Sequence, residues 1–600
     1  MKTKKKKWIT ASLLATVATA SIAGVAWGNG GGSDDWDEED FTPPAFMFAR
    51  RSIGGVNAAP ASPPYIASSR IAAVGDGALA SDADSGQLIL TDAAGKSIAQ
   101  LAIGGDAALL AFDDVARRAY VADRRGDRVV VVDVGDASLA ITATWKTPAE
   151  PYGVALAPNR ATVYVTTIAD RTLVALDAAT GRERWRAALS PEPRGLAIAP
   201  DESRVVIASL TSGAVDEIVL GEAARTRKVA LPSARNQHAR GAFSVAFVGH
   251  TAVLPFQLAI PIAPHIETSD HYGGGFDAPI SQHVAFLGGD HRQSVAQTNI
   301  VEPRAIAWNG DRDIMYLVGM ASDHMVAIGK ASQIEVVPPI ITALPTHCGA
   351  DGVAVTGSGS VLVWCSFKRS VARLEPKKTT IDAGPELIAS TLTEDVRLGR
   401  TLFHQASFHS STNGQMSCGS CHLDGRADGL SWQIQGGALQ TPVIGGRLVG
   451  TAPYKWDGKA ADLATSIRAT VRRLGGEGLS RRDVRYLVSF LESMPAPRVP
   501  TRDAGAVARG KALFESGELG CTTCHEGPAL TDRETHDLAG SFDTPGLGAL
   551  AVSAPYFHDG SAATLEAVLH DRGRVHGMSE GAKQLRGDDL ADLIAFLETR

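Results

Sequence analysis

The first half of the chain repeats a short, apolar, β-branched run that is followed by a polar turn. Across residues 70–374 the clearest runs begin 42 to 46 residues apart, except for one gap of 110 residues that would hold two blades, one of them with an insertion. The clearest of them are AYVAD (119–123), VYVTT (163–167), VVIAS (205–209), MYLVG (315–319) and VLVWC (361–365). A four-stranded sheet cannot bury two apolar faces alone, whereas sheets packed around an axis can. The pattern therefore predicts an all-β propeller over residues 70–375.

Beyond residue 375 the spacing of apolar positions changes from strands to helices. Residues 376–393 predict a linker, because they carry prolines and lysines and have no apolar period. Three later segments, 395–403, 480–494 and 587–600, space their apolar residues three and four apart, as amphipathic helices do. In the second of these, Ser480 followed by Asp483 is typical of a capping-box start.

The helical part contains the same series of motifs twice. The first copy reads GRTLF, CGSCH, TPVIGGRLVGTAPYKWDG and YLVSFLE, and the second reads GKALF, CTTCH, TPGLGALAVSAPYFHDG and DLIAFLE. The interval from the motif histidine to the proline of TP is equal in the two copies (422 to 442 and 525 to 545). We therefore predict two homologous all-α domains in tandem, residues 394–500 and 501–600.

The start of the chain has the pattern of an export signal. MKTKKKK is basic, and the apolar, uncharged stretch after it contains small residues, which predicts a cleaved signal peptide over residues 1–28. An uncleaved membrane anchor is the alternative, since the stretch approaches spanning length. Residues 29–69 include NGGGSDDWDEEDF and predict a solvated tether. We expect the mature protein in the periplasm or otherwise exported.

Net charge and cysteine content limit the partners and the kinds of site that the chain can have. The 600 residues carry a net charge of −7, which gives no reason to expect nucleic acid as a partner. Six residues are cysteines, and four of them lie in the two CxxCH motifs. The other two, Cys348 and Cys365, flank apolar runs that GSGS would turn into a hairpin. In an exported chain this predicts a structural disulfide, with two free thiols as the alternative.

The two CxxCH motifs predict covalent haem attachment. Two thiols on one short turn can add to the two vinyl groups of a haem, and the adjacent histidine then reaches the iron. A redox disulfide would need a βαβ context, and a zinc site would need four ligands from copies that lie far apart. The two helical domains are thus predicted to be cytochrome c domains with one c-type haem each. The residues are Cys418, Cys421 and His422 for haem 1, and Cys521, Cys524 and His525 for haem 2.

The helical half resembles the di-haem bacterial cytochrome c peroxidase and MauG family. The resemblance rests on LGRTLF before the first motif, TAPYKWDG after it and SAPYFHDGSAATLE after the second, and it covers about a third of the chain. The propeller lies outside it and resembles the YVTN type, which implies seven blades. The resemblance implies a first haem that reacts with hydrogen peroxide and a second haem that passes electrons to it. A small redox protein as donor, or a protein substrate, would then dock on the propeller.

The family also implies further site residues. Trp456 stands where the inter-haem electron relay would lie, with an ordinary packed aromatic as the alternative. The sixth ligand of haem 2 would be Met578 or His576, because Arg572 at the aligned position cannot ligate iron. A calcium ion between the halves would be bound loosely through Gln440, Ser553 and Pro555.

The first iron has few candidate ligands on its open side. Between His422 and His525 there is no other histidine, and the methionine there is Met494. The iron would keep an open site, as peroxide chemistry needs, or borrow His404 or His409. The family's distal glutamate falls close to Glu477, for which a loop carboxylate is the alternative.

Three functions remain open on the sequence alone. The first is an exported di-haem oxidoreductase of peroxidase or MauG type, which uses peroxide as acceptor. The second is a non-catalytic di-haem electron carrier. The third is a metal or small-molecule redox site in the propeller, with the haems as electron outlet; residues 238–291 contain six histidines that suit such a site, although packing or surface roles are the alternative.

Overall fold

The structure is a computed structural model, and it describes residues 68–600 apart from several short segments. Those segments are 222–223, 235, 262–278, 289–290, 296–297, 334–338, 412–413, 435–436, 539 and 571–579. The predicted signal peptide (1–28) and all but the end of the predicted tether (29–69) lie outside the described residues. No helix among the described residues is long and apolar enough to cross a bilayer.

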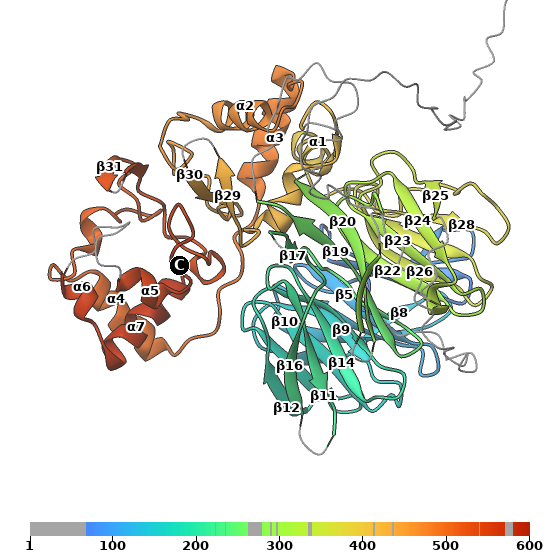
Figure 1. Cartoon of the computed structure of the whole chain (residues 1–600). Helices are drawn as coiled ribbons and strands as arrows, with labels where there is room; N and C mark the ends of the chain where they lie inside the picture. Colours follow the sequence, from blue (N-terminus) through green and yellow to red (C-terminus); the bar gives the residue numbers. More distant parts are fainter. Residues whose placement is uncertain are drawn as a thin grey trace, which may run out of the picture. The chain divides into compact units, whose positions relative to one another are not determined.

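The N-terminal half folds into seven antiparallel sheets, which confirms the seven-blade propeller (Figure 1). Each of the first four blades is a meander of four strands in chain order. Their strands are β1 (Ile71–Val74), β2 (Gly77–Asp82), β3 (Gln87–Thr91), β4 (Ser97–Ala102), β5 (Ala107–Asp113), β6 (Arg118–Asp123), β7 (Arg128–Val134), β8 (Leu139–Lys146), β9 (Pro151–Leu156), β10 (Thr162–Thr167), β11 (Thr172–Asp177), β12 (Glu183–Ala188), β13 (Pro193–Ile198), β14 (Arg204–Ser209), β15 (Ala214–Val219) and β16 (Arg225–Ala230).

The last three blades vary this plan. The fifth has an additional short strand, β18, paired with β19, and the seventh has three strands. A disulfide joins Cys348, just before the seventh blade, to Cys365 at the end of its second strand. The strands are β17 (His238–Arg240), β18 (Ala246–Val248), β19 (Thr251–Ala259), β20 (Ile280–Gly288), β21 (His291–Val295), β22 (Pro303–Asn309), β23 (Ile314–Gly319), β24 (His324–Gly329), β25 (Ile340–Ala343), β26 (Ala350–Val355), β27 (Val361–Cys365) and β28 (Ser370–Leu374), with the turn η1 (Ala331–Gln333) before β25.

Burial falls from the innermost to the outermost strand of a blade. Every residue of β9 is buried, whereas most of β12 is exposed. The first strands of most neighbouring blades lie against each other, and the fifth blade makes these contacts through β18 and β19. The ring closes where β1 lies against β26. The apolar runs thus form the cores between blades, because each β-branched strand is covered on both faces. The first residues of the inner strands face the propeller axis, where the site described below is built.

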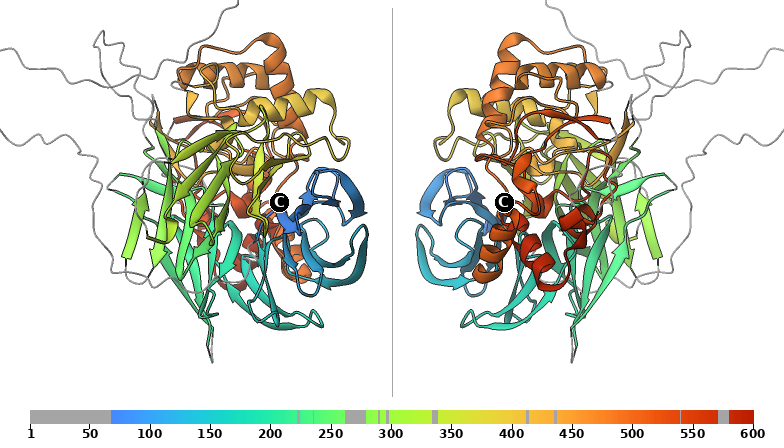
Figure 2. Two further views of the ribbon diagram at one scale, coloured as in Figure 1. Left: turned by 90° about the vertical axis from the view of Figure 1, so that its right-hand side faces the viewer. Right: turned by 90° about the vertical axis from the view of Figure 1, so that its left-hand side faces the viewer.

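The helical half contains the two predicted copies (Figure 2, orange and red). The first has α1 (Glu394–His404), η3 (Cys418–Ser420), η4 (Leu423–Gly425), β29 (Ser431–Ile434), β30 (Gly437–Gln440), α2 (Leu463–Arg473) and α3 (Arg481–Ser493). The second has α4 (Ala504–Phe514), η5 (Cys521–Thr523), β31 (Thr535–Leu538), β32 (Gly540–Asp543), η6 (Leu550–Val552), α5 (Leu565–Leu569), α6 (Glu580–Gln584) and α7 (Gly587–Glu598).

The two copies repeat the same contacts. A Cβ on Gly399 would lie 1.9 Å from the Tyr486 carbonyl oxygen, and a Cβ on Gly510 would lie 1.9 Å from the Asp592 carbonyl oxygen. Only glycine therefore lets α1 cross α3, and α4 cross α7, this closely. The hydroxyl groups of Tyr454 and Tyr556 each donate to a backbone carbonyl six residues earlier, both at 2.8 Å.

Candidate functional site

The first CxxCH motif lies on a short turn with a tight cap. The Ser417 side chain accepts from the backbone N–H of Ser420, and the Ser420 side chain accepts from the N–H of Ser417. Cys418 packs against an apolar cluster that includes Phe403 and Leu487. Cys421 packs instead against a cluster that contains Trp432. The two thiols of one turn therefore reach two apolar surfaces, as attachment of a large planar ring requires.

Both motif histidines are held in the tautomer that can ligate iron. His422 Nδ1 donates to the Pro442 carbonyl at 3.1 Å, and His525 Nδ1 donates to the Leu530 carbonyl at 2.9 Å. A carbonyl only accepts, so the proton is on Nδ1 and the lone pair is on Nε2. Burial lowers the pKa of His422 to about 4 and lowers the pKa of His525 as well, which keeps both rings neutral. The residues present fit two c-type haems.

The thiols themselves do not fit a redox disulfide. All four motif cysteines are free, while Cys348 and Cys365 form a disulfide. Burial raises the pKa of Cys418 to about 12 and that of Cys421 to about 11. Redox-active CxxC motifs depend on a lowered thiol pKa. These thiols have the opposite shift, which argues against a redox-active disulfide.

Trp456 lies at the contact between the two helical copies. Its indole Nε1 donates to the Gln440 carbonyl at 3.0 Å, and its own carbonyl accepts from the Asp543 N–H at 2.9 Å. Its ring centroid is 6.4 Å from that of His558, in an edge-on arrangement. In the aligned motifs APYKWDG and APYFHDG, His558 is the counterpart of Trp456. The structure thus brings an aromatic pair to the boundary between the copies, as a relay would need.

Two of the three residues predicted for calcium, Gln440 and Ser553, are joined by a direct hydrogen bond. The Gln440 side-chain amide donates to the Ser553 carbonyl at 3.1 Å, and Pro555 follows two residues later in the same segment. Arg447 Nη1 donates to the Ser553 hydroxyl at 3.3 Å, so a positive charge already lies beside this group. Calcium at Gln440, Ser553 and Pro555 stays a prediction.

The groups predicted around the first iron lie in two different places. Glu477 is exposed on a loop and forms an ion pair with exposed His409 at 3.1 Å. His404 is buried at the end of α1, and its Nδ1 lies 2.7 Å from Glu302 of the propeller. The distal role of Glu477 therefore stays a prediction, as does ligation by His404 or His409.

Two other predictions lie partly or wholly outside the described residues. Met578 and His576, the alternatives for the sixth ligand of haem 2, are both outside them. In the histidine-containing segment 238–291 the stretch 262–278 is also outside. Among the residues that the structure does describe, the group with metal-ligand geometry is Cys524, Asp532 and His536, and it uses a motif cysteine.

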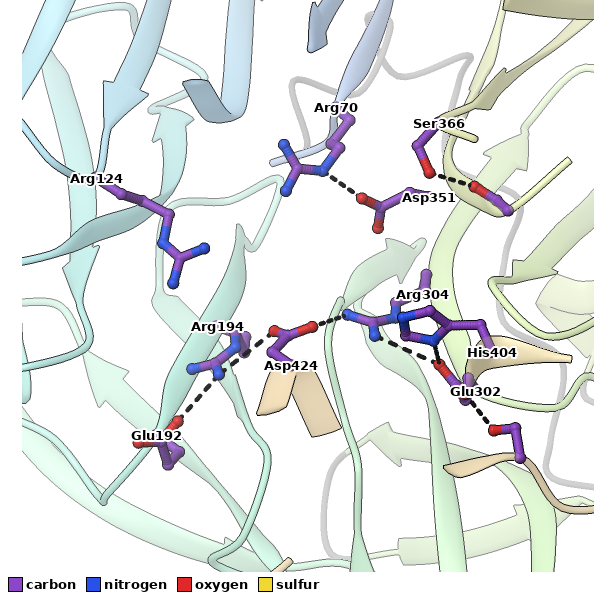
Figure 3. A network of polar contacts seen from close by, with 12 residues as sticks. Arg70, Arg124, Glu192, Arg194, Glu302, Arg304, Asp351, Ser366, His404 and Asp424 are labelled. Atoms are coloured by element: carbon purple, nitrogen blue, oxygen red, sulfur yellow. Dashed lines mark hydrogen bonds and ion pairs between the residues drawn. The ribbon is translucent and has the colours of Figure 1, made fainter. Parts of the chain in front are cut away.

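Sequence analysis missed a network that joins the first motif to the propeller axis (Figure 3). Residues 423–428, here called the axis loop, follow His422 directly. Asp424 of this loop lies 2.7 Å from Arg304 and 3.6 Å from Arg194. Arg426 lies 2.6 Å from Glu150 and 2.7 Å from Glu192. The charges of the loop are therefore matched by charges at the starts of the inner strands.

More contacts secure the axis loop. Arg240 of the propeller lies 2.5 Å from Asp428 and donates to the Ser420 carbonyl at 2.7 Å. Leu423 is fully buried against Leu210 and Phe243. The first motif is thus held from both sides of His422 by residues of the propeller.

A signal for this network is present in the sequence. Three blades begin with Glu-Pro, at Glu150, Glu192 and Glu302, and each glutamate has a positive φ just before its inner strand. All three are buried at the axis. A charged residue repeated at the start of buried strands indicates a partner of opposite charge, because isolated buried charges are costly.

Acid should weaken this network. Burial alone would raise the pKa of Glu150 and Glu302. Arg426 with Arg124 at Glu150, and His404 with Arg304 at Glu302, nevertheless hold the pKa of each carboxyl below its ordinary value. A carboxylate with a lowered folded-state pKa stabilises the fold above the unfolded value and loses that effect as pH falls through the folded value. We expect the melting temperature to drop as pH falls from about 5 to 3. Glu302→Gln should reduce the size of that drop, whereas Glu515→Gln on the surface should leave it as in the parent protein.

Comparisons with known proteins match the helical half to a di-haem peroxidase family model and to relatives of MauG and peroxidase type. A family model described as di-haem cytochrome c peroxidase matches residues 393–491. Methylamine utilization protein MauG of Methylorubrum extorquens is 28% identical over 342 residues, which cover 44% of this chain and 94% of that protein. Cytochrome c551 peroxidase of Nitrosomonas europaea is 26% identical over 270 residues, which cover 34% and 78%. A solved structure of Kuenenia stuttgartiensis hydrazine synthase aligns with a TM-score of 0.41 and 14% identity, over 54% of this chain and 99% of that one.

Proposed function

Because the C-terminal part of this chain belongs to the di-haem cytochrome c peroxidase and MauG family, we propose that the protein is an exported di-haem oxidoreductase that uses hydrogen peroxide as electron acceptor. The observation that carries the proposal is the pair of CxxCH turns, each with a histidine fixed through Nδ1. The predicted signal peptide supports export to the periplasm, where c-type haem is attached.

In this proposal each helical copy would hold one haem, and the two haems would have different roles. When bound, the haems would supply one-electron transfer from haem 2 to haem 1 and peroxide reduction at the latter. Cys418, Cys421 and His422 would hold haem 1. Cys521, Cys524 and His525 would hold haem 2. The propeller, which binds the axis loop, would dock the electron donor or a protein substrate.

The test is the visible spectrum and peroxide reactivity of the holoprotein matured in an export-competent host. We expect two covalent haems per chain by pyridine haemochrome assay. We also expect a high-spin component in the oxidised protein that disappears when hydrogen peroxide is added. Two low-spin haems that ignore peroxide would contradict the proposal and would support a simple electron carrier instead.

The proposed relay makes a separate prediction. Trp456→Phe removes the indole between the copies, so electron transfer from reduced haem 2 to peroxide should slow, while both haems attach normally. Stopped-flow oxidation of the fully reduced protein measures this rate. Trp185→Phe is the matched control, because that tryptophan packs on Tyr164 within a blade. Equal rates in the two variants would show that Trp456 is a packing residue.

A further inference from the structure

Glu302 differs from the other two glutamates at the propeller axis. Glu150 and Glu192 pair with Arg426, in the loop that follows the first motif. Glu302 instead reaches the turn that carries the motif cysteines, where the Ser417 hydroxyl donates a hydrogen bond to it. The Glu302 side chain is fully buried, so its charge acts on this turn through protein rather than through water.

The backbone of the first motif lies directly against the Glu302 carboxylate. A Cβ on Gly419, the residue after the first motif cysteine, would lie 2.3 Å from Glu302 Oε1 and 2.8 Å from His404 Nδ1. A side chain at this position would force the carboxylate or the turn to move, so glycine is what permits the close approach. The residue type inside the motif therefore matches the presence of the propeller carboxylate.

Three side chains hold the Glu302 carboxylate in place. The Ser417 hydroxyl donates to one oxygen, and His404 Nδ1 donates to the other at 2.7 Å. Arg304 lies 3.5 Å from Glu302 but only 2.7 Å from Asp424, so its charge is shared between two carboxylates. Figure 3 shows the Glu302 carboxylate between His404 and Arg304. The negative charge thus has a fixed position beside the turn.

This charge acts on the site where the first haem would be attached. Burial first, and the negative charge of Glu302 second, raise the pKa of the Cys418 thiol to about 12. A charge that disfavours a thiolate at this sulfur favours added positive charge beside it. Iron gains one positive charge when it is oxidised, so the Glu302 carboxylate would favour the oxidised form of an iron held by this turn.

The second motif has different surroundings. Its turn begins at Gly520, where no side chain forms a capping hydrogen bond. Thr522 stands at the position that corresponds to Gly419, and it is exposed. A carboxylate buried against one turn and not against the other would give two haems of a duplicated unit different reduction potentials.

We propose that the propeller lowers the reduction potential of haem 1 through the charge of Glu302, which favours the oxidised iron at the first motif. The inference rests on the proposed function only in requiring that Cys418 and Cys421 attach a haem, and it does not depend on a reaction with peroxide. It makes the propeller part of the redox unit, in addition to the docking role proposed above.

The test is a redox titration of the holoprotein at neutral pH, followed by visible spectroscopy, without peroxide or a donor protein. Glu302→Gln keeps the size and hydrogen-bonding capacity of the side chain but removes its charge. At a fixed potential the ratio of reduced to oxidised haem 1 should rise about tenfold, which is a midpoint increase of about 59 mV for one electron. The corresponding ratio for haem 2 should change less than threefold. A protein with Cys521→Ala and Cys524→Ala, which cannot attach haem 2, assigns the two midpoints.

Asp113→Asn is the matched control for loss of a buried propeller carboxylate. Asp113 pairs with Arg160 and is the last residue of the inner strand β5, whereas Glu302 stands just before the first residue of β22. The Asp113→Asn protein should therefore have both midpoints of the parent protein. A shift of haem 1 in this variant as large as in Glu302→Gln would overturn the assignment to Glu302.

Arg304→Gln gives a test of opposite sign, which also applies if Glu302→Gln does not accumulate as folded protein. It removes a positive charge beside the same carboxylate, so the haem 1 midpoint should fall. A loosened contact would not reverse the direction of the shift between these two variants. An unchanged haem 1 midpoint in Glu302→Gln, or shifts of the same sign in both variants, would overturn the proposal. The expected shifts in a protein that ignores peroxide would uphold it and contradict the proposed function alone.

Discussion

Replacing His422 with alanine should lower the rate of peroxide reduction by at least about 100-fold, since loss of the iron ligand itself should exceed the 10–100-fold effect of losing its supporting groups. The ring is fixed through Nδ1 by the Pro442 carbonyl, and no neighbouring residue in its short turn can take its place. Steady-state oxidation of a reduced small cytochrome by hydrogen peroxide measures the effect, with haem content determined in the same samples.

Two companion variants separate the roles of the copies. His525→Ala should also lose steady-state turnover, but its oxidised protein should keep the spectral response to peroxide. His250→Ala, at an exposed propeller histidine paired with Asp201, should behave as the parent protein. If His422→Ala kept the peroxide response and His525→Ala lost it, the assignment of the reactive site to the first copy would be wrong.

Replacing Arg426 with alanine should destabilise the protein by about 3–5 kcal/mol, the typical result of breaking a buried ion pair from one side. The Arg426 side chain is 2% exposed and bridges Glu150 and Glu192, so its removal takes a positive charge from two buried carboxylates. Arg426→Lys should rescue only part of the loss, because an ammonium group cannot bridge two carboxylates as a planar guanidinium does. Urea denaturation, followed by tryptophan fluorescence, measures both.

A surface arginine supplies the control for this experiment. Arg485→Ala removes a pair that is 3.7 Å long and exposed, and should change stability by no more than about 0.5 kcal/mol. Equal stabilities of the Arg426→Ala and Arg485→Ala proteins would mean that the axis loop is not held by its charges.

The repeats in the sequence were enough to predict the architecture. Runs such as VYVTT are apolar on both faces, which requires neighbours on both sides, and the ring of blades supplies them. The duplicated motifs, from GRTLF to the final helix, likewise predicted two copies, and Gly399 and Gly510 show why each copy keeps its glycine. In both cases the information is local and recurs along the chain.

The charges at the propeller axis could not be predicted in the same way. Asp424 and Arg426 read as ordinary loop charges, because their partners Arg304, Glu150 and Glu192 are more than a hundred residues away in sequence. Their pairing depends on which face of the propeller receives the helical half, and no periodicity in the chain encodes that. The contact of His404 with Glu302 is a further example, because the two residues are 102 positions apart in the sequence.

The axis loop belongs to the first helical copy, so the two copies contact the propeller in different ways. Loop residues Asp424, Arg426 and Asp428 form ion pairs with the propeller. The second copy touches the propeller through contacts such as Arg171 with the Ala551 carbonyl and Thr501 with Asp170. The segment 376–393 separates a strand-rich sequence from a helix-rich one. The two halves are nevertheless joined by the buried ion pairs of the axis loop. The two motifs of one duplicated unit therefore have different electrostatic surroundings, because charged residues of the propeller pair with the loop that follows the first motif.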